Sequence, residues 1–377
     1  MRDGFEFEVL SSVGTARRGR LTTPHGVIQT PAFMAVATYG AVRGVGPGEL
    51  ASLGSQILLA NTFHLHERPG ESLIRELGGL HGFTGWHGPW LTDSGGFQAL
   101  SLGTGVKLDE EGVAFASPVD GRRRLLTPER AIEIQEALGP DIALVLDQLV
   151  PADAAGEAAW GDAMERTLRW AERSVRQHAR PDQALFGIVQ GGASPALRRA
   201  SATGTAELGF DGYAHGGLGL GEDPARRVEL VAESQAFLPA GAPRYLMGLG
   251  RPCDLLEAIA VGVDLFDCVV PTRHARHGVV YTSLGRRTLR NARYRDDDAP
   301  LDPACDCPAC AVHSRAYLRH LFAAGDMLGP RLATLHNLRF YFQLLEDTRA
   351  AIADGSEAAE GLESVWERAR RASEPVE

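Results

Sequence analysis

The 377-residue sequence lacks the features that would place it in several special classes of protein. Nowhere does an apolar run approach the length that a membrane-spanning helix needs. The start of the chain, residues 1–6, has neither the basic region nor the apolar core of a signal peptide, so we expect a cytoplasmic protein. Cysteine is also scarce, because five residues in a chain of this length do not make a disulfide framework.

The charge is unevenly distributed. A formal net charge of −10 argues against indiscriminate binding of nucleic acid. Between residues 271 and 295, however, there are seven arginines and no carboxylate, with His274 and His277 beside them. A solvated charged face and an anion-binding surface both agree with this run, and phosphate is the obvious anion.

Eight short apolar runs alternate with amphipathic stretches through most of the chain. These candidate strands are residues 31–37, 56–62, 90–93, 141–147, 184–190, 212–218, 244–248 and 264–270. Eight βα repeats predict an α/β fold with a closed (β/α)8 barrel, and a doubly wound open sheet is the alternative. Alternating residues near the N-terminus predict an antiparallel β cap before the barrel.

The barrel hypothesis demands that functional residues lie at the carboxyl ends of the strands. Polar residues, glycines and one methionine do occur at or near these ends, namely Asp93, Asp147, Gln190, Gly216, Gly217, Met247 and Asp267. We expect three parts in the chain: the barrel with its N-terminal hairpin at residues 1–290, a zinc-binding subdomain at 291–340, inserted after strand eight, and a C-terminal helical segment at 341–377.

Three cysteines lie close together in the sequence, at Cys305, Cys307 and Cys310. In a protein without disulfides such a cluster indicates a metal, and a tetrahedral structural zinc requires a fourth ligand. His336 is the best candidate, while His313 and His320 are weaker ones. The expected site is closed, with protein ligands only, and is therefore structural. The remaining two cysteines are interpreted as small buried apolar residues.

Residues 263–276 read as a buried strand that is interrupted by Asp267 and followed by an arginine-rich turn. A second carboxylate, Asp93, precedes a Ser-Gly-Gly sequence that leaves room for a flat ligand. Chemistry at an anomeric carbon commonly uses two carboxylates, one as nucleophile and one as acid/base. Alone, Asp93 is equally compatible with a turn or a helix cap. The glycines at 216–221 do not match a dinucleotide-binding fingerprint and better suit close approach of a ligand.

Several motifs together resemble one family, the bacterial tRNA-guanine transglycosylases, in order and spacing from Thr22 to about Leu345. They are TDSGGFQ (92–98), FGIVQGG (186–192), YLMG (245–248), FDCVVPTRHARHG (266–278) and the set Cys305, Cys307, Cys310 and His336. The resemblance implies a zinc-bearing barrel enzyme that exchanges guanine at the tRNA wobble position for a 7-deazaguanine, most often 7-aminomethyl-7-deazaguanine, in queuosine biosynthesis.

The resemblance also implies roles for individual residues. Asp267 becomes the nucleophile that forms a covalent intermediate with the ribose, and Asp93 the acid/base group. The implied base-binding residues are Asp93, Ser94, Gly95, Gly96, Phe97, Asp147, Gln190, Gly217, Leu218 and Met247. The implied RNA-contacting residues are Gly248, Leu249, Gly250, Arg251, Pro252, Cys253, Asp254, Thr272, Arg273, His274, Ala275 and Arg276. A homodimer is expected from the same resemblance.

The chain departs from the bacterial pattern around the predicted base pocket. It has Gln148, Leu149 and Val150 after Asp147, His215 before the paired glycines, and Gly219-Leu220 after Leu218. Glu222, expected to support an aminomethyl group, is retained. Eukaryotic members also carry an apolar residue at the position of Leu149, so queuine is an alternative inserted base. A non-catalytic RNA-binding paralogue, an unrelated zinc hydrolase and a DNA acceptor are further alternatives.

Overall fold

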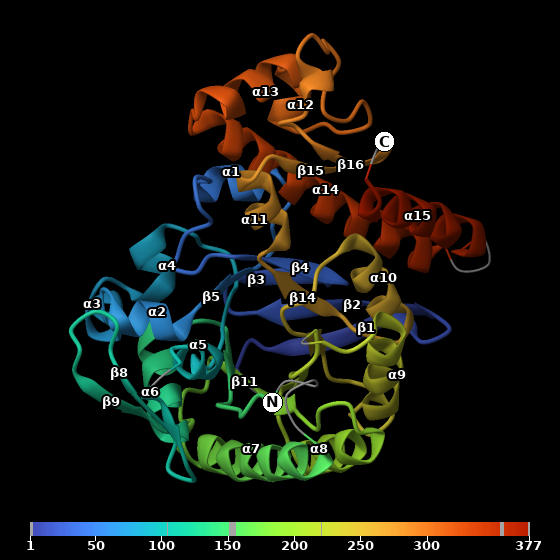
Figure 1. Cartoon of the computed structure of the whole chain (residues 1–377). Coiled ribbons are helices and arrows are strands. Elements are labelled where there is room, and N and C mark those ends of the chain that lie inside the picture. The colour runs from blue at the N-terminus through green and yellow to red at the C-terminus, as the bar shows by residue number, and fades with distance from the viewer. Residues whose placement is uncertain (1–2, 104, 151–155, 220, 355–357, 376–377) are drawn as a thin grey trace.

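The computed structural model describes residues 3–103, 105–150, 156–219, 221–354 and 358–375. Eight parallel strands close into a barrel, and pairing of the last strand with the first completes the circle through Leu265↔Ala32 to Cys268↔Ala35 (Figure 1). The barrel strands are β4 (Ala32–Val36), β5 (Leu58–Ala60), β6 (Trp90–Thr92), β10 (Ile142–Leu144), β11 (Ala184–Val189), β12 (Gly212–His215), β13 (Arg244–Leu246) and β14 (Leu265–Cys268). All eight lie within the predicted runs, so the barrel is confirmed and the open sheet was wrong.

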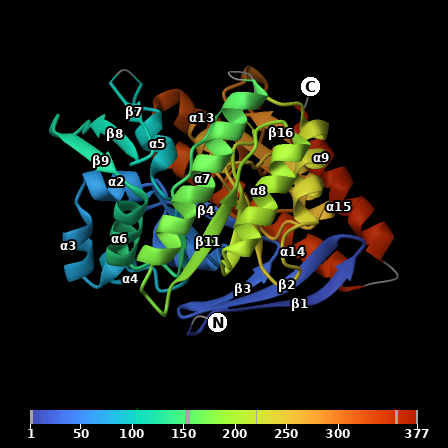
Figure 2. The same cartoon turned by 90° about the horizontal axis from the view of Figure 1, so that it is seen from below.

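The predicted N-terminal cap is an antiparallel sheet of β1 (Glu6–Val13), β2 (Ala16–Thr23) and β3 (Gly26–Thr30). Its inward residues Leu21 and Ile28 are fully buried and belong to the same apolar cluster as residues of the barrel strands. Seen from below, the sheet lies along one side of the barrel, far from β8 and β9 (Figure 2). Burial of these apolar side chains is what holds the cap against the barrel.

Helices cover the outside of the barrel and connect its strands. They are α1 (Pro47–Ser52), α2 (Thr62–Glu67), α3 (Glu71–Glu76), α4 (Gly79–Thr84), α5 (Gly96–Leu100), α6 (Pro128–Leu138), α7 (Glu157–Gln177), α8 (Pro195–Glu207), α9 (Pro224–Gln235) and α10 (Pro252–Ala260). The start of α6 is fixed by a cap, because the side chain of Thr127 accepts a hydrogen bond from the Arg130 N–H and Pro128 follows at the first helical position.

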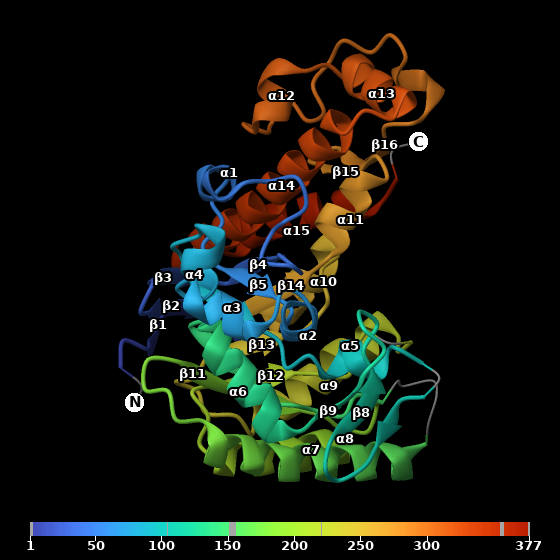
Figure 3. The same ribbon diagram turned by 90° about the vertical axis from the view of Figure 1, so that its left-hand side faces the viewer.

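An insertion between β6 and α6 forms a second antiparallel sheet of β7 (Lys107–Leu108), β8 (Val113–Ala116) and β9 (Arg123–Leu126). The sequence analysis did not predict this sheet. Its strands β8 and β9 stand beside α5 (Figure 3). Phe115 on β8 packs its ring against Phe63 of α2 at 5.4 Å, so the insertion is attached through the core.

The segment after β14 is a helix, α11 (Val270–Arg276), and the predicted arginine-rich turn was wrong. Pro271 sits in the first turn, where its missing N–H costs nothing and its ring favours the helical φ. Beyond α11 come β15 (Val279–Thr282), β16 (Gly285–Thr288), the 3-10 helix η1 (Ala292–Tyr294), α12 (Pro308–Val312), α13 (Arg315–Ala324), α14 (Leu328–Ala353) and α15 (Ala358–Ser373).

The helices α12 and α13 lie together at one end of the molecule, and the long α14 leads from them to the flank of the barrel (Figures 1 and 3). The predicted boundary between residues 340 and 341 falls inside α14, and the three-part division stays a prediction. Among the described helices, none combines the length and the apolar character that crossing a bilayer requires.

Candidate active site and metal centre

A cavity of about 430 Å³ opens at the carboxyl ends of the barrel strands. Three carboxylates from three different strand ends line it: Asp93 after β6, Asp147 after β10 and Asp267 near the end of β14. The predicted base-binding residues Ser94, Gly95, Phe97, Gly217, Leu218 and Met247 line it as well. The structure therefore brings most of the predicted site residues together, as the strand-end rule for barrels demands.

Asp93 is held by neutral donors from two elements. Its Oδ1 accepts the Thr62 N–H at 2.8 Å, and its Oδ2 accepts the side-chain amides of Asn61 and Gln98. Burial raises the pKa of Asp93, and the hydrogen bonds only partly oppose this effect. A carboxyl group with a raised pKa can exchange a proton with a ligand in the cavity. Gln98 closes the TDSGGFQ motif without having been given a role, and Asn61, just before α2, was not singled out because a lone amide carries no recognisable signal.

Among the described residues, Asp267 also has neutral partners only. Its Oδ1 accepts the hydroxyl of Tyr245 at 2.6 Å and the N–H of Gly248 at 2.6 Å. Burial raises the pKa of Asp267, and the negative charge of Asp93 acts in the same direction. Burial also raises the pKa of the Tyr245 phenol well above its ordinary value, so the hydroxyl remains a donor. Both donors bind one carboxylate oxygen, which leaves the other for a different task.

Asp147 lies deeper, beside Gln190 at the end of β11. The Gln190 Nε2 donates to Asp147 Oδ2 at 2.6 Å, and burial raises the pKa of Asp147 to about 6. The glycines beside them are required by space. A Cβ on Gly216 would lie 2.6 Å from the Gln190 amide, and one on Gly217 would lie 2.3 Å from it. These glycines therefore allow close approach of the Gln190 side chain, and close approach of a ligand to them stays a prediction.

A buried arginine that the sequence analysis missed supports both glycine loops. Arg198 on α8 is fully buried and donates to the carbonyl oxygens of Gly192 at 3.0 Å and Gly216 at 2.8 Å. Burial lowers the pKa of Arg198 to about 10, which still leaves it charged. One side chain thus fixes the backbone at the ends of two neighbouring strands. In the sequence it is one of two consecutive arginines on an amphipathic helix, where a solvated role is the default.

The residues that depart from the bacterial pattern do not all lie in the cavity. Leu149 and Gly219 line the cavity. His215 does not, and its side chain lies fully buried on β12 with Nδ1 3.2 Å from the hydroxyl of Ser234 on α9. Gln148 turns away to accept a hydrogen bond from Arg166 on α7. The expectation that His215 surrounds the base pocket was therefore wrong. Successive strand residues face opposite sides, and His215 faces the helix layer.

The predicted RNA-contacting segments lie on both sides of Asp267: the first spans the loop after β13 and the first turn of α10, and the second lies within α11. In the first segment Gly248 and Arg251 are exposed, while Leu249, Gly250, Pro252 and Asp254 are buried. In the second, Arg273 is exposed, and Thr272 and Ala275 are buried. Each segment thus presents an arginine at the surface on a buried apolar base. Burial lowers the pKa of Arg276, and the positive charges of Arg43 and Arg273 act in the same direction. Arg43 therefore lies near the basic surface.

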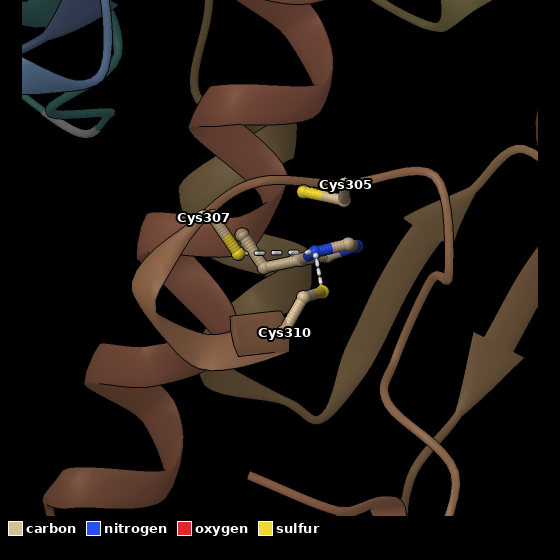
Figure 4. A group of neighbouring side chains, drawn as sticks. Cys305, Cys307 and Cys310 are labelled. Atoms are coloured by element: carbon tan, nitrogen blue, oxygen red, sulfur yellow. Dashed lines mark hydrogen bonds between the residues drawn. The ribbon is translucent and has the colours of Figure 1, made fainter. Parts of the chain in front are cut away.

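The cysteine cluster converges as predicted. Cys305, Cys307, Cys310 and His336 present ligand atoms within 4.8 Å of one another, and Figure 4 shows the three cysteines gathered around one point. The His336 Nδ1 lies 3.2 Å from the Cys310 sulfur and 3.6 Å from that of Cys307. Ligands of one tetrahedral zinc are roughly 3.6 Å apart. The other ring nitrogen, Nε2, lies 2.7 Å from the Tyr281 carbonyl, so its proton belongs there and Nδ1 faces the sulfurs with a lone pair. These donors fit a metal.

A second group, His25, His81 and Asp141, has metal-ligand residue types but a different geometry. The two imidazole rings stack at 3.5 Å with an interplanar angle of 16°. Because ring lone pairs lie in the ring planes, parallel stacked rings cannot direct them at one ion. One nitrogen of each ring instead contacts Asp141: His25 Nδ1 lies 2.9 Å from Oδ1, and His81 Nε2 lies 3.2 Å from Oδ2. This group is a hydrogen-bonded support beneath the barrel.

The fold and the cavity define a (β/α)8-barrel protein with a carboxylate-lined site and a Cys3His group. Residues 12–367 match the model of a family described as queuine tRNA-ribosyltransferase. The chain is 53% identical over 353 residues to a queuine tRNA-ribosyltransferase of Thermus thermophilus. The aligned residues cover 94% of this chain and 91% of that protein. A protein of the same name from Thioalkalivibrio sulfidiphilus is 51% identical over 350 residues, with 93% and 94% covered. The chain belongs to the queuine tRNA-ribosyltransferase family, and the resemblance drawn from the motifs is confirmed.

Proposed function

We propose that this chain is a tRNA-guanine transglycosylase that exchanges guanine at the wobble position for a 7-deazaguanine by double displacement. The observation that carries the proposal is the pair Asp93 and Asp267 in one cavity, each held by neutral donors. Two carboxylates that face one site are the arrangement that substitution at an anomeric carbon with retained configuration requires.

In the first step Asp267 Oδ2 attacks C1′ of the ribose, and the bond between C1′ and N9 of guanine breaks. Tyr245 and Gly248 hold Oδ1 and thereby aim the second oxygen. Guanine leaves with the electron pair of the broken bond and takes up a proton from Asp93. A covalent ester joins the enzyme to the RNA. The raised pKa of Asp93 makes the carboxyl a competent proton donor.

In the second step the incoming base gives its N9 proton to the Asp93 carboxylate, and N9 attacks C1′. The ester bond breaks and Asp267 leaves as a carboxylate. Asp147 and Gln190 accept and donate hydrogen bonds at the guanine-like edge, supported by the backbone of Gly217 and Leu218. Phe97 and Met247 line the cavity from two elements and suit the two faces of a flat base. A base without this edge would leave Asp147 unpaired, which gives discrimination.

The RNA strand is proposed to cross the exposed arginines on either side of the nucleophile. Arg251 and Arg273 stand at the surface, and Arg276 is the half-buried last residue of α11. No carboxylate of the described residues forms an ion pair with Arg273 or Arg276. Such unpaired guanidinium groups are suited to phosphate. A chain of net charge −10 then binds RNA through one local surface.

We assign zinc to the Cys3His group as a structural ion. Three thiolates and one imidazole are the ligand set that zinc prefers, and all four come from the protein. When bound, the ion joins α12 to α14 and supplies no chemistry to the cavity. Substituting His336 by alanine is expected to reduce zinc content, measured by elemental analysis, from one ion per chain to a small fraction. Zinc content unchanged in this variant would contradict the assignment.

A homodimer and a cytoplasmic location also belong to the proposal. Val312 and Met327, on either side of α13, are 75% and 87% exposed, which is unusual for apolar side chains of this size. Their burial in a partner would remove the exposed surface. Sedimentation analysis of the zinc-loaded protein measures the association directly, and a monomer at micromolar concentration would contradict this part.

The decisive experiment incubates the enzyme with labelled guanine and tRNA that carries guanine at the wobble position. Label must enter the RNA, and a denaturation-resistant enzyme–RNA adduct must form. Absence of both would exclude transglycosylation. Competition with 7-aminomethyl-7-deazaguanine and with queuine then identifies the inserted base. Because Leu149 and Gly219 line the cavity, queuine is the second candidate, and preferential inhibition by queuine would establish it.

A further inference from the structure

The long helix α14 holds both of the segments that flank Asp267. On one side, the fully buried amide of Asn337 donates to the carbonyl oxygen of Pro271, in the first turn of α11, at 2.9 Å. On the other side, the hydroxyl of Tyr341 donates to the carbonyl oxygen of Gly250, in the loop between β13 and α10. Asn337 and Tyr341 are four residues apart, so they lie on the same face of the helix.

The loop that Tyr341 contacts also reaches the proposed nucleophile. The N–H of Gly248, two residues before Gly250, donates to Asp267 Oδ1 at 2.6 Å. The second donor to this oxygen, Tyr245, lies on strand β13, where pairing with two neighbouring strands fixes its position. Gly248 follows the end of that strand and has a φ of +71°. The position of its N–H therefore depends on how the loop is held.

The side chain of Tyr341 is itself held on several sides. It is fully buried, and its ring centroid lies 5.0 Å from that of Phe33 on β4 and 5.5 Å from that of Tyr281 on β15. Burial raises the pKa of the Tyr341 phenol well above its ordinary value, so the hydroxyl remains a donor. Without it, the carbonyl of Gly250 would be a buried acceptor with no partner among the described residues, which is unfavourable.

Gly250 in turn packs directly against the end of the nucleophile's strand. A Cβ on Gly250 would lie 2.4 Å from the Cβ of Cys268, which follows Asp267 in β14. The Cys268 sulfur lies 3.4 Å from the carbonyl oxygen of Gly248. Contact this close leaves no space for the loop to move independently of the end of β14. Tyr341 does not line the cavity, so it can act on Asp267 only through this loop.

We propose that Tyr341 is a positioning residue for the nucleophile. Its hydroxyl fixes the carbonyl of Gly250 and thereby keeps the Gly248 N–H on Asp267 Oδ1, which aims the other carboxylate oxygen at the ribose. The inference rests on the proposed function, because it requires Asp267 to attack a sugar. Loss of the hydroxyl should slow the covalent step and leave the binding of the free base nearly unchanged.

The test is a single turnover of the full-length, zinc-loaded enzyme in saturating excess over tRNA, without free base. It measures the rate constant for formation of the denaturation-resistant adduct, which does not depend on the fraction of folded protein. The variant Tyr341→Phe removes one oxygen atom and should lower this rate constant about tenfold, because the nucleophile is misaligned. In the exchange reaction, KM for guanine should change by less than about twofold. An unchanged rate constant would overturn the inference.

Tyr294 provides a matched control, because it is a second buried phenol outside the cavity. Its side chain, on η1, is 2% exposed, and its hydroxyl accepts a hydrogen bond from Arg287 at 3.4 Å. The variant Tyr294→Phe should retain the wild-type rate constant of adduct formation. An equal loss in this variant would contradict the inference, since removal of any buried hydroxyl would then have the same effect.

A second variant tests the loop with the Tyr341 hydroxyl in place, and it decides the question if Tyr341→Phe does not fold. In Gly250→Ala the new methyl group meets Cys268, so the loop must shift. Adduct formation should slow by a similar factor, and a wild-type rate constant would refute the inference. If the wild type forms no adduct, the proposed function fails and the inference falls with it. A wild type and a Tyr341→Phe variant that form the adduct equally fast defeat the inference alone.

Discussion

The two ends of the barrel both carry buried carboxylates, but their partners differ in kind. At the carboxyl ends of the strands, Asp93, Asp147 and Asp267 bind only neutral donors: amides, a phenol and backbone N–H groups. At the amino ends, Asp264 binds the guanidinium of Arg17 through both oxygens, at 2.8 and 2.5 Å. The first arrangement leaves negative charge open to a cavity, and the second neutralises it.

The amino-end carboxylates connect parts of the fold. Asp264 also accepts the backbone N–H of Arg244 at 2.7 Å, so it ties the N-terminal sheet to two barrel strands. For Asp141, burial opposes ionisation, but hydrogen bonds from His81, the Trp90 N–H and His25 outweigh it and lower the pKa. Burial alone therefore does not separate a functional carboxylate from a structural one. The charge of the neighbouring groups separates them. A buried carboxylate without a positive partner reduces stability, so its presence indicates a role in chemistry.

The largest expected difference between the two ends is in activity. Substituting Asp267 by asparagine should remove the denaturation-resistant RNA adduct and lower kcat/KM by about a thousandfold or more, because the nucleophile is lost. Gel analysis under denaturing conditions and labelled guanine incorporation measure both effects. An adduct that persists would show that another residue is the nucleophile.

The second difference is in stability. Substituting Asp264 by asparagine should lower the free energy of unfolding by about 3 to 5 kcal/mol, because Arg17 would remain as an uncompensated buried charge. Urea unfolding measures the change, and kcat of the folded fraction should stay within about twofold of the wild type. The double variant Arg17→Met, Asp264→Leu should recover most of the loss. A loss of activity larger than the loss of folded protein would contradict the comparison.

A stabilising substitution is expected at the opposite end. The pKa of Asp147 is raised from 3.8 to about 6 in the folded protein, so the ionised form destabilises the fold above that pH. Substituting Asp147 by asparagine should therefore increase the free energy of unfolding at pH 7 by about 1 to 3 kcal/mol. The gain should vanish below about pH 4, where Asp147 is protonated in both states. A destabilised variant at pH 7 would contradict this reasoning.

The smallest expected effect is on the pH dependence of base binding. As the pH falls from 7 to 5, Asp147 takes up a proton with a pKa of about 6 and loses its ability to accept from the base. The KM for the base should rise about tenfold over this interval, with the free enzyme's pKa visible in kcat/KM. In the control variant Asp147→Asn, KM for the base should not change between pH 7 and pH 5. The same rise of KM in that variant would assign the titration to another group.

Much of this architecture could be predicted from residues alone. The eight strands appear as separate apolar runs, and burial of a parallel strand on both faces requires such runs. The metal group was predictable because cysteines at 305, 307 and 310 are close enough in sequence to converge in any compact fold. Asp93, Asp147 and Asp267 were predictable as strand-end residues, since a barrel gathers those ends at one face.

The remaining features depend on contacts between distant segments. The helical conformation of α11, the sheet of β7, β8 and β9, and the outward side chain of His215 depend on packing against other segments, which a pattern of apolar residues does not encode. Arg17 meets Asp264 across 247 residues, and Arg198 reaches the ends of two strands. No spacing rule connects such pairs, because their proximity results from closure of the barrel.

The sequence by itself determined the type of fold, the family, the four members of the Cys3His group and the two carboxylates that we propose for the chemistry. Only the tertiary structure decided which carboxylates are neutralised and which face the cavity uncompensated. The physical reason is that a residue type carries its charge in the sequence, whereas the electrostatic environment of that charge exists only after distant segments have packed around it.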